Sequence, residues 1–533
     1  MSFLIPFPLP ALLVEKSAVW CGLLVVGFAT ACVALRPGHM RKKRFWRTEL
    51  AYLDTPNDSP LLGTVVISGG SISGILAARM CSQRFEKVIL VDPEFRKVDQ
   101  GPSKSRIMQY HSCHGFPNAF TEGICELWPG FLEKLKQRGG MADFKVHYNG
   151  VYVPAPDSLP ITVNIRRSKL DPLLQSLLLE HYSDSDPSKL IIMDGTVQMI
   201  MQSPENQSIE SVTVRMLDGS AVQLDNIDLF IDCTGNTQTG KKWLRLGPWL
   251  RYPMPQCLSY DPNMTYVTVT FSVSEELEEK LPVPGGYNST TWFYTFRPHH
   301  EWCNAGFLLT KMDNNTVQFC CGSWGPYELP RAPDQLESFV RSVKGRDPVP
   351  DWVPTMVGIL ASQGKPEFER VRIPKCKYVQ YHLMKKLPQN FVAMGDSVLQ
   401  LNPLYGQGSL MAMLGVVTLN TMLLECKNRK LTPSFSREYF KTLAGRQAGL
   451  WTATKAVDYG FKTTTPVAGE KLSNGKIIRW FTDKLEAASE TDRHIVSLVW
   501  QVRQQLLPEN TLAQPAFLVR LFWVLFLQKM KED

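Results

Sequence analysis

The chain has 533 residues, of which 44% are hydrophobic and 20% charged, an ordinary globular composition with room for two or three structural units. The formal net charge of +8 is mild and comes with no aromatic-interleaved basic patch, which argues against nucleic-acid binding. The twelve cysteines form no C-x-x-C pair and no metal-ligand spacing, so we expect reduced thiols and no metal site.

An uncharged apolar run stands near the N-terminus. Residues 17–35 (SAVWCGLLVVGFATACVAL) would form a helix about 28 Å long, close to the roughly 30 Å thickness of a bilayer core. Six basic residues follow between Arg36 and Arg47, so the positive-inside rule predicts that the rest of the chain faces the cytosol. A cleaved signal peptide is the alternative. The sequence therefore predicts a single-pass membrane protein, in the endoplasmic reticulum, with membrane lipid as a partner.

A strand, a glycine turn and a helix follow one another between residues 64 and 80. A helix that opens directly after such a turn directs unpaired amides and the positive end of its dipole at a phosphate. The next strand ends at Asp92, 23 residues after Gly69, the spacing at which a carboxylate meets ribose hydroxyls. A turn without a ligand is the alternative. The candidate cofactor-binding residues here are Gly69, Gly70, Ser71, Ile72, Gly74 and Asp92.

A second strand, more than three hundred residues later, ends in Gly395 and Asp396. Residues 402–408 (NPLYGQG) and an apolar helix follow it. The first amides of that helix, near Gly408 and Ser409, would stabilise negative charge on a bound group. A strand, turn and helix without a ligand is again the alternative, but the two segments together predict one dinucleotide site.

These two segments resemble those of the class A flavoprotein monooxygenases, a family that includes squalene epoxidases and fungal biosynthetic monooxygenases. The resemblance covers residues 63–425 and implies FAD as the cofactor, with Asp396 on its ribityl chain. It also implies that Arg106 and Arg167 approach the FAD. The strand that ends in Cys233-Thr234-Gly235 is similar to the family's Asp-Ala-Thr-Gly strand, with Cys233 in place of alanine.

The pattern changes from βα units to β hairpins between residues 243 and 388. We expect strands at 266–273, 292–297, 305–312 and 316–324, the last two paired across a turn. In the resembling family this sheet covers the flavin and forms the substrate pocket. Trp292, Tyr294 and Phe296 stand at alternate positions and hence on one face, so they are candidate substrate residues. Their alternative role is simply sheet core.

The region after residue 425 is predicted to be helical, with helices at 476–487 and 492–507. The apolar segment 517–527 is too short to span a bilayer. It would lie in a membrane interface or pack on the protein's own core.

The predicted fold class is α/β: a Rossmann-like FAD-binding domain with an inserted β-sheet substrate domain, an N-terminal transmembrane helix and C-terminal helices. The predicted parts are an N-terminal tail (1–16), the transmembrane helix (17–35), a basic linker (36–62), the first part of the FAD domain (63–242), the β-rich substrate domain (243–388), the Gly-Asp part of the FAD domain (389–425) and a helical, membrane-associated region (426–533).

The resemblance implies an enzyme, an FAD-dependent monooxygenase. NADPH or NADH, or a separate reductase partner, would reduce the FAD, and O2 would then form a flavin C4a-hydroperoxide. One oxygen atom would enter the substrate by epoxidation or hydroxylation. The anchor favours a lipophilic isoprenoid or polyketide in secondary-metabolite biosynthesis. No side chain needs to be a nucleophile, so the catalytic residues are unknown.

Three alternatives stay open. A flavin halogenase shares the fold, but the halogenase signature Trp-x-Trp-x-Ile-Pro is absent. An isoprenoid double-bond reductase would carry the same FAD motifs. A non-catalytic prenyl-protein escort on this fold would bind no flavin.

Overall fold

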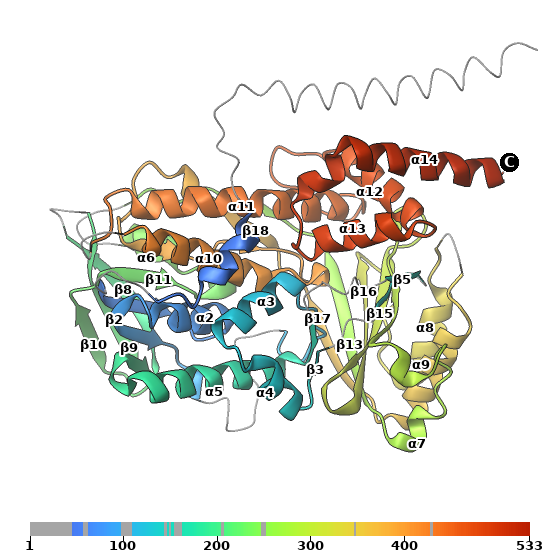
Figure 1. The fold of residues 1–533 in the computed structure, drawn as a ribbon, viewed down its shortest axis with the longest axis horizontal. Helices are drawn as coiled ribbons and strands as arrows, with labels where there is room; N and C mark the ends of the chain where they lie inside the picture. The colour runs from blue at the N-terminus through green and yellow to red at the C-terminus, as the bar shows by residue number, and fades with distance from the viewer. Residues whose placement is uncertain are drawn as a thin grey trace, which may run out of the picture.

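The computed structural model describes most of the chain after residue 44 (Figure 1). The described residues are 45–56, 62–96, 109–142, 146–148, 151–153, 162–203, 207–246, 252–345, 348–426 and 430–532. Arg106 and the stretch 17–35 lie outside them.

The predicted membrane location needs correction. Among the described residues, none of the helices combines the length and the apolar character that crossing a bilayer requires. The C-terminal helix α14 (Pro515–Glu532) is long enough, but charged side chains such as Arg520 and Lys529 interrupt its apolar run. This finding contradicts the predicted single-pass protein of the endoplasmic reticulum.

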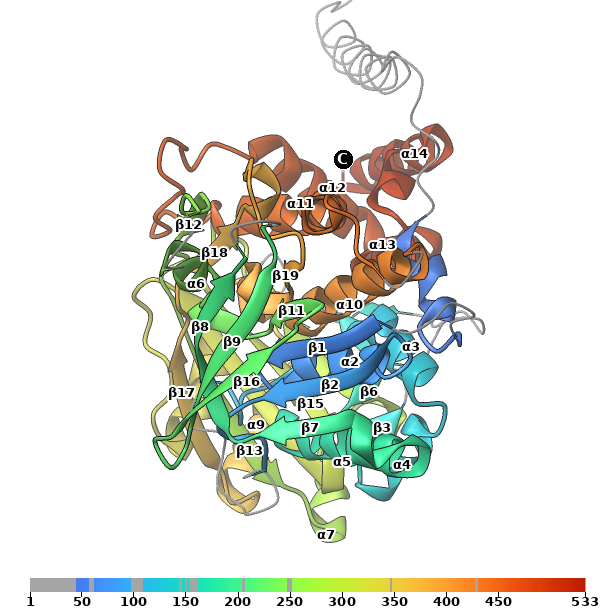
Figure 2. The same cartoon turned by 90° about the vertical axis from the view of Figure 1, so that its left-hand side faces the viewer.

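A five-stranded parallel sheet forms the centre of the first layer, and the chain has a mixed α/β fold. The strand order is β19 (Phe391–Ala393), β11 (Leu229–Asp232), β1 (Leu62–Ser68), β2 (Phe85–Val91) and β7 (Leu190–Met193). These strands read as short apolar runs because a parallel sheet is covered on both faces. In the helical layer, α2 (Ile72–Cys81) contacts both α10 (Gly408–Leu424) and α5 (Arg167–Ser185) (Figure 2).

The order of the central strands explains why distant segments meet. From β1 the sheet continues through β2 on one side and through β11 and β19 on the other. Ligands of such open sheets bind at the carboxyl ends of the strands, at the point where the order reverses. The turn after β1, Asp92 after β2 and Gly395 after β19 all stand at that edge.

The inserted sheet has seven strands, in the order β17 (Glu367–Arg372), β13 (Met264–Ser272), β16 (Thr316–Trp324), β15 (Ala305–Met312), β14 (Trp292–Phe296), β4 (Val146–Tyr148) and β5 (Val151–Val153). The predicted hairpin is confirmed, because β15 and β16 pair from Ala305 opposite Ser323 to Met312 opposite Thr316. Helices α8 (Leu336–Ser342) and α9 (Trp352–Gln363) share a buried apolar core with this sheet. Phe319 of the sheet and Met356 of α9 belong to that core.

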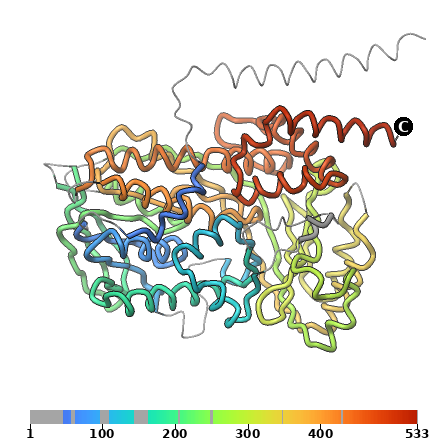
Figure 3. The backbone as a smooth tube through the Cα atoms, in the orientation of Figure 1, coloured from blue at the N-terminus to red at the C-terminus, as the bar shows by residue number. Residues whose placement is uncertain are grey.

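The C-terminal helices form a small cluster over the inserted sheet, at one end of α11 (Phe435–Asp458) (Figures 1 and 3). Leu485 of α12 (Lys476–Ser489), Ile495 of α13 (Arg493–Arg503) and Leu521 of α14 are buried against one another. Arg520 of α14 also pairs with Asp492 at 2.9 Å. The apolar segment 517–527 therefore packs part of its surface on the protein's own core, while Val519, Trp523 and Phe526 stay exposed.

The remaining elements are helices and the strands of smaller sheets. They are α3 (Asn118–Leu127), α4 (Phe131–Gln137), β3 (Met141–Ala142), β6 (Val163–Asn164), β8 (Gly195–Gln202), β9 (Ile209–Met216), β10 (Ala221–Asp225), α6 (Gly240–Leu246), β12 (Cys257–Tyr260), α7 (Glu275–Glu278), β18 (Cys376–Val379) and β20 (Leu399–Gln400).

Candidate functional site

The first glycine turn has the geometry of a phosphate cradle. Gly69 takes a φ of +109°, which turns the chain from β1 toward α2. A Cβ on Gly74 would lie 1.8 Å from the Gly69 carbonyl oxygen, so only glycine allows α2 to start this close to the strand. Ser71 is the N-cap residue, yet its side chain makes no capping bond to the helix. The first amides of α2 are thus left uncapped by a side chain, as anion binding requires.

Asp92 is fixed beside this turn. One carboxylate oxygen accepts a hydrogen bond from Gly70 N at 2.8 Å, and the other accepts one from Glu94 N at 2.8 Å. Each oxygen of a carboxylate accepts two hydrogen bonds, so both retain capacity for ligand hydroxyls.

Asp396 reaches the same edge from the far end of the chain. The buried residue Asp232 holds this segment in place. Its carboxylate accepts a hydrogen bond from Ser397 Oγ at 3.2 Å, and its backbone oxygen accepts one from Met394 N at 3.1 Å. Gln238 Nε2 donates to the Asp396 backbone oxygen at 3.1 Å. Burial raises the pKa of Asp396 to about 6, while the positive charge of Arg167 lowers it.

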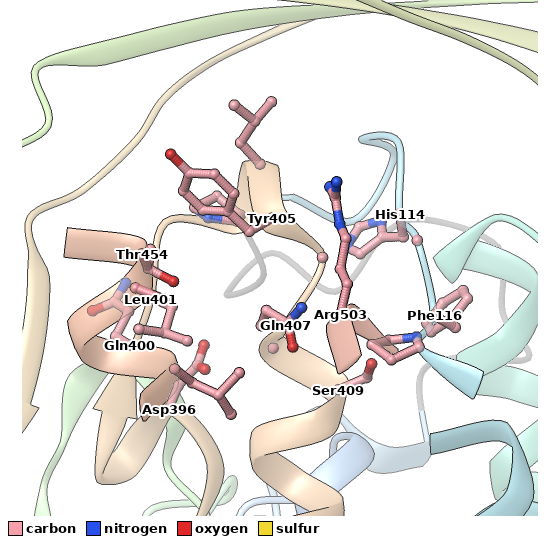
Figure 4. A pocket seen from close by; sticks show the side chains of 18 of the residues that line it. His114, Phe116, Asp396, Gln400, Leu401, Tyr405, Gln407, Ser409, Thr454 and Arg503 are labelled. Carbon is pink, nitrogen blue, oxygen red and sulfur yellow. The ribbon is translucent and has the colours of Figure 1, made fainter. Parts of the chain in front are cut away.

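Loop 402–408 leads into a helix whose first residues face the cavity. The Asn402 side chain accepts a hydrogen bond from Leu404 N at 3.1 Å, and Gly406 leaves the short turn with a φ of +66°. Helix α10 then begins at Gly408 and has no side-chain cap. Figure 4 shows Gln407 and Ser409 at this start, with Asp396 nearby.

Arg167 connects the two halves. It is the first residue of α5, where its guanidinium donates to Ser71 Oγ at 3.0 Å and lies 3.6 Å from the buried Asp171. One cavity of about 2400 Å³ contains both glycine segments. Among the predicted cofactor residues, those that line it are Gly69, Gly70, Ser71, Ile72, Asp92, Arg167, Asp396, Gly408 and Ser409, whereas Gly74 lies behind the turn.

The residues present fit an FAD molecule. Several buried polar atoms of residues that line the cavity have no hydrogen-bond partner, among them Gln400 Oε1, Gln407 Oε1 and Ser409 Oγ. Buried polar atoms are seldom left unpaired, which points to a polar ligand beside them. A pyrophosphate against α2, ribose hydroxyls at Asp92 and a polar ring edge at α10 would match these groups.

The predicted substrate residues divide between two surfaces. Trp292 and Phe296 line the cavity. Tyr294 and Phe296 share one face, where both stack on Phe307 with ring centroids 5.9 and 5.7 Å apart, and Tyr294 also meets Trp352 at 6.1 Å. The prediction of one shared face is wrong for Trp292, because a β-bulge between Trp292 and Tyr294 breaks the alternation of the strand there.

His114 is a cavity residue that sequence reasoning missed. Its Nδ1 lies 2.8 Å from the Ser112 carbonyl oxygen, so Nδ1 carries the proton and Nε2 is an acceptor. Burial, together with Arg167, lowers the pKa of His114 to about 3, which keeps the ring neutral. A lone histidine outside any motif offers no sequence signal.

The C-terminal helices also contribute to the cavity, although their sequence indicated no function. Trp500 of α13 meets Trp292 edge to face at 6.1 Å, and both line the cavity. Gln504 Oε1 accepts a hydrogen bond from Asn118 N at 2.9 Å, which holds the end of α13 against α3. Figure 4 shows Arg503 beside His114 and across from Asp396.

Solved structures share the fold over most of the chain. A flavin-dependent brominase, Bmp2, superposes with a TM-score of 0.56 at 11% identity, covering 89% of this chain and 100% of its own. The chain has the fold of a flavoprotein. A flavoprotein/dehydrogenase from Cytophaga hutchinsonii matches equally well, with a TM-score of 0.56, 11% identity and the same coverage of both chains. The sequence matches no protein-family model, and a search of curated proteins found no relative.

Proposed function

We propose that this flavoprotein fold serves an FAD-dependent monooxygenase that inserts one atom of O2 into a lipophilic isoprenoid or polyketide, by epoxidation or hydroxylation. The main support is the joint cavity: two glycine segments and a wall of aromatic side chains surround the same space. NADPH or NADH is the proposed electron donor, and secondary-metabolite biosynthesis is the proposed setting.

FAD would supply the redox chemistry, since its reduced form transfers electrons to O2. The chain's own residues bind and orient the partners. Uncapped amides of α2 would hold the pyrophosphate, and the positive end of α10 would stabilise negative charge on the ring. The neutral His114 offers Nε2 as a fixed hydrogen-bond acceptor at the cavity.

The proposed substrate class depends on the rest of the cavity. Its volume exceeds the roughly 300 to 1,000 Å³ of ordinary ligand pockets, so a large substrate fits beside FAD. Aromatic side chains of the inserted sheet and of the C-terminal helices dominate that part, among them Trp292, Phe296, Trp324, Trp480 and Trp500. Such a wall excludes water from the site of oxygen transfer.

Isotope labelling tests the proposal. The FAD-loaded protein is incubated with NADPH, ¹⁸O2 and a panel of isoprenoid alkenes and phenolic polyketides, and the products are analysed by mass spectrometry. We expect one labelled oxygen atom in the product and none from labelled water. Turnover that proceeds without O2 would indicate a double-bond reductase instead, and a folded protein that never binds flavin would indicate an escort.

A halogenase is the second candidate, because the brominase Bmp2 shares the fold. Repeating the assay with and without bromide separates the two. A product that contains bromine and forms only with bromide present would replace the monooxygenase proposal.

A further inference from the structure

A buried carboxylate outside the predicted site lies behind the cavity wall. Asp458, the last residue of α11, has no exposed surface. Its Oδ2 accepts a hydrogen bond from Tyr260 Oη at 2.7 Å. Its Oδ1 accepts from Trp324 Nε1 at 2.9 Å and from Tyr405 Oη at 3.0 Å.

A fourth donor completes this set. The Asn402 side-chain amide donates to both oxygens of Asp458, at 3.0 and 3.3 Å. All four donors are neutral groups, although a buried charge is costly unless its surroundings compensate for it. Burial accordingly raises the pKa of the Asp458 carboxyl to about 6, against the hydrogen bonds, which lower it.

Three of the donors come from the two walls that a flavin enzyme must align. Trp324 is the last residue of β16 in the inserted sheet, and it stacks on Phe461 with ring centroids 4.1 Å apart. Tyr405 and Asn402 belong to loop 402–408, which leads into α10. Trp324 and Tyr405 both line the cavity, so one carboxylate holds a residue of each wall.

We propose that Asp458 is a positioning residue that clamps loop 402–408 to the inserted sheet and so fixes the substrate wall relative to the flavin. The proposal rests on the proposed FAD site at this loop. Asp458 itself lies behind Trp324 and Tyr405 and would act through them. Removal of the Asp458 carboxylate would change the position of the inserted sheet relative to the flavin ring, while FAD would still bind.

The test compares D458N and Y405F with E470Q as the control. Glu470 is another carboxylate of this region, but it accepts from Lys455 at 2.6 Å and from Tyr459 at 2.7 Å, and neither residue belongs to the loop. Amide hydrogen exchange of residues 402–408 is measured without FAD, and the visible spectrum and reduction potential of bound FAD are measured after loading.

We expect exchange in loop 402–408 to become about tenfold faster in D458N, equivalent to about 1.4 kcal/mol. The spectrum and potential of bound FAD should shift in both D458N and Y405F, whereas E470Q should match the wild type. If D458N does not fold, Y405F, which removes a single hydrogen bond, carries the test.

One result would be a D458N variant that is less stable and yet exchanges the amide hydrogens of the loop at the wild-type rate, with an unchanged flavin spectrum. That result would overturn the positioning role, because Asp458 would then be only structural. A wild-type protein that takes up no FAD would overturn the proposed function instead. The exchange comparison without FAD would still decide whether Asp458 holds the loop.

Discussion

Single residues with opposite charge set the electrostatics of the cofactor cradle. Arg167 and Asp396 come from distant parts of the chain, and the arginine lowers the pKa of the carboxyl that burial raises. Sequence motifs could locate both residues, because each stands next to a recognisable strand end or helix start. They could not locate His114, which stands in no motif, or Asp458, whose partners Tyr260 and Trp324 come from distant segments.

FAD affinity should depend on pH through Asp396. A ribityl hydroxyl of bound FAD would donate to the ionised Asp396 carboxylate, and the raised pKa of about 6 means that protonation would remove this acceptor below pH 6. The apparent Kd should therefore rise about tenfold per pH unit below 6 and stay constant above pH 7. Fluorescence titration with FAD measures it.

D396N should bind FAD more weakly and lose this pH dependence. D218N is the matched control, since Asp218 lies in a surface turn where its carboxylate bonds only Ser220. A D396N variant with the wild-type pH profile would show that another group titrates.

At the scale of elements, local patterns predicted the βα units and the β15–β16 hairpin because their strands, turns and helices are set by neighbouring residues. The face of Trp292 relative to Tyr294 and Phe296 could not be predicted, since one bulge in β14 reverses the alternation between Trp292 and Tyr294. The role of α13 could not be predicted either. Its amphipathic pattern does not reveal that Trp500 meets Trp292, more than two hundred residues earlier.

The close approach of α2 to β1 predicts a large cost for a single methyl group. G74A would place Cβ 1.8 Å from a backbone oxygen that cannot move aside. We expect the free energy of unfolding, measured with urea, to fall by about 1–3 kcal/mol. G130A is the control, because nothing lies within 4 Å of a Cβ at Gly130. Equal stability of both variants would contradict the tight βα packing.

The two sides of β14 should respond differently to truncation. W292A should raise the KM for the lipophilic substrate severalfold and leave FAD affinity unchanged, because Trp292 faces the cavity. Y294A should instead lower the free energy of unfolding by about 3–5 kcal/mol, because its ring is buried against Phe307 and Trp352. The opposite pattern of effects would reverse the assignment of the two faces.

At the scale of the whole molecule, the parallel sheet brings together segments separated by more than three hundred residues, since the strand order reverses at β1. The sequence indicated this convergence through its motifs. The single-pass membrane prediction depended on residues outside the described chain, and the described helices contradict it.

The central claim, one FAD site made from both halves, is tested most directly by the flavin content of purified protein. The variants R167Q and D396A alter the linking arginine and the second half. Both are compared as folded protein, because R167Q also removes the cation beside the buried Asp171. We predict about one FAD per wild-type chain after loading, and far less in both variants. A folded wild-type protein that retains no FAD, or variants that bind it as tightly as the wild type, would contradict the account.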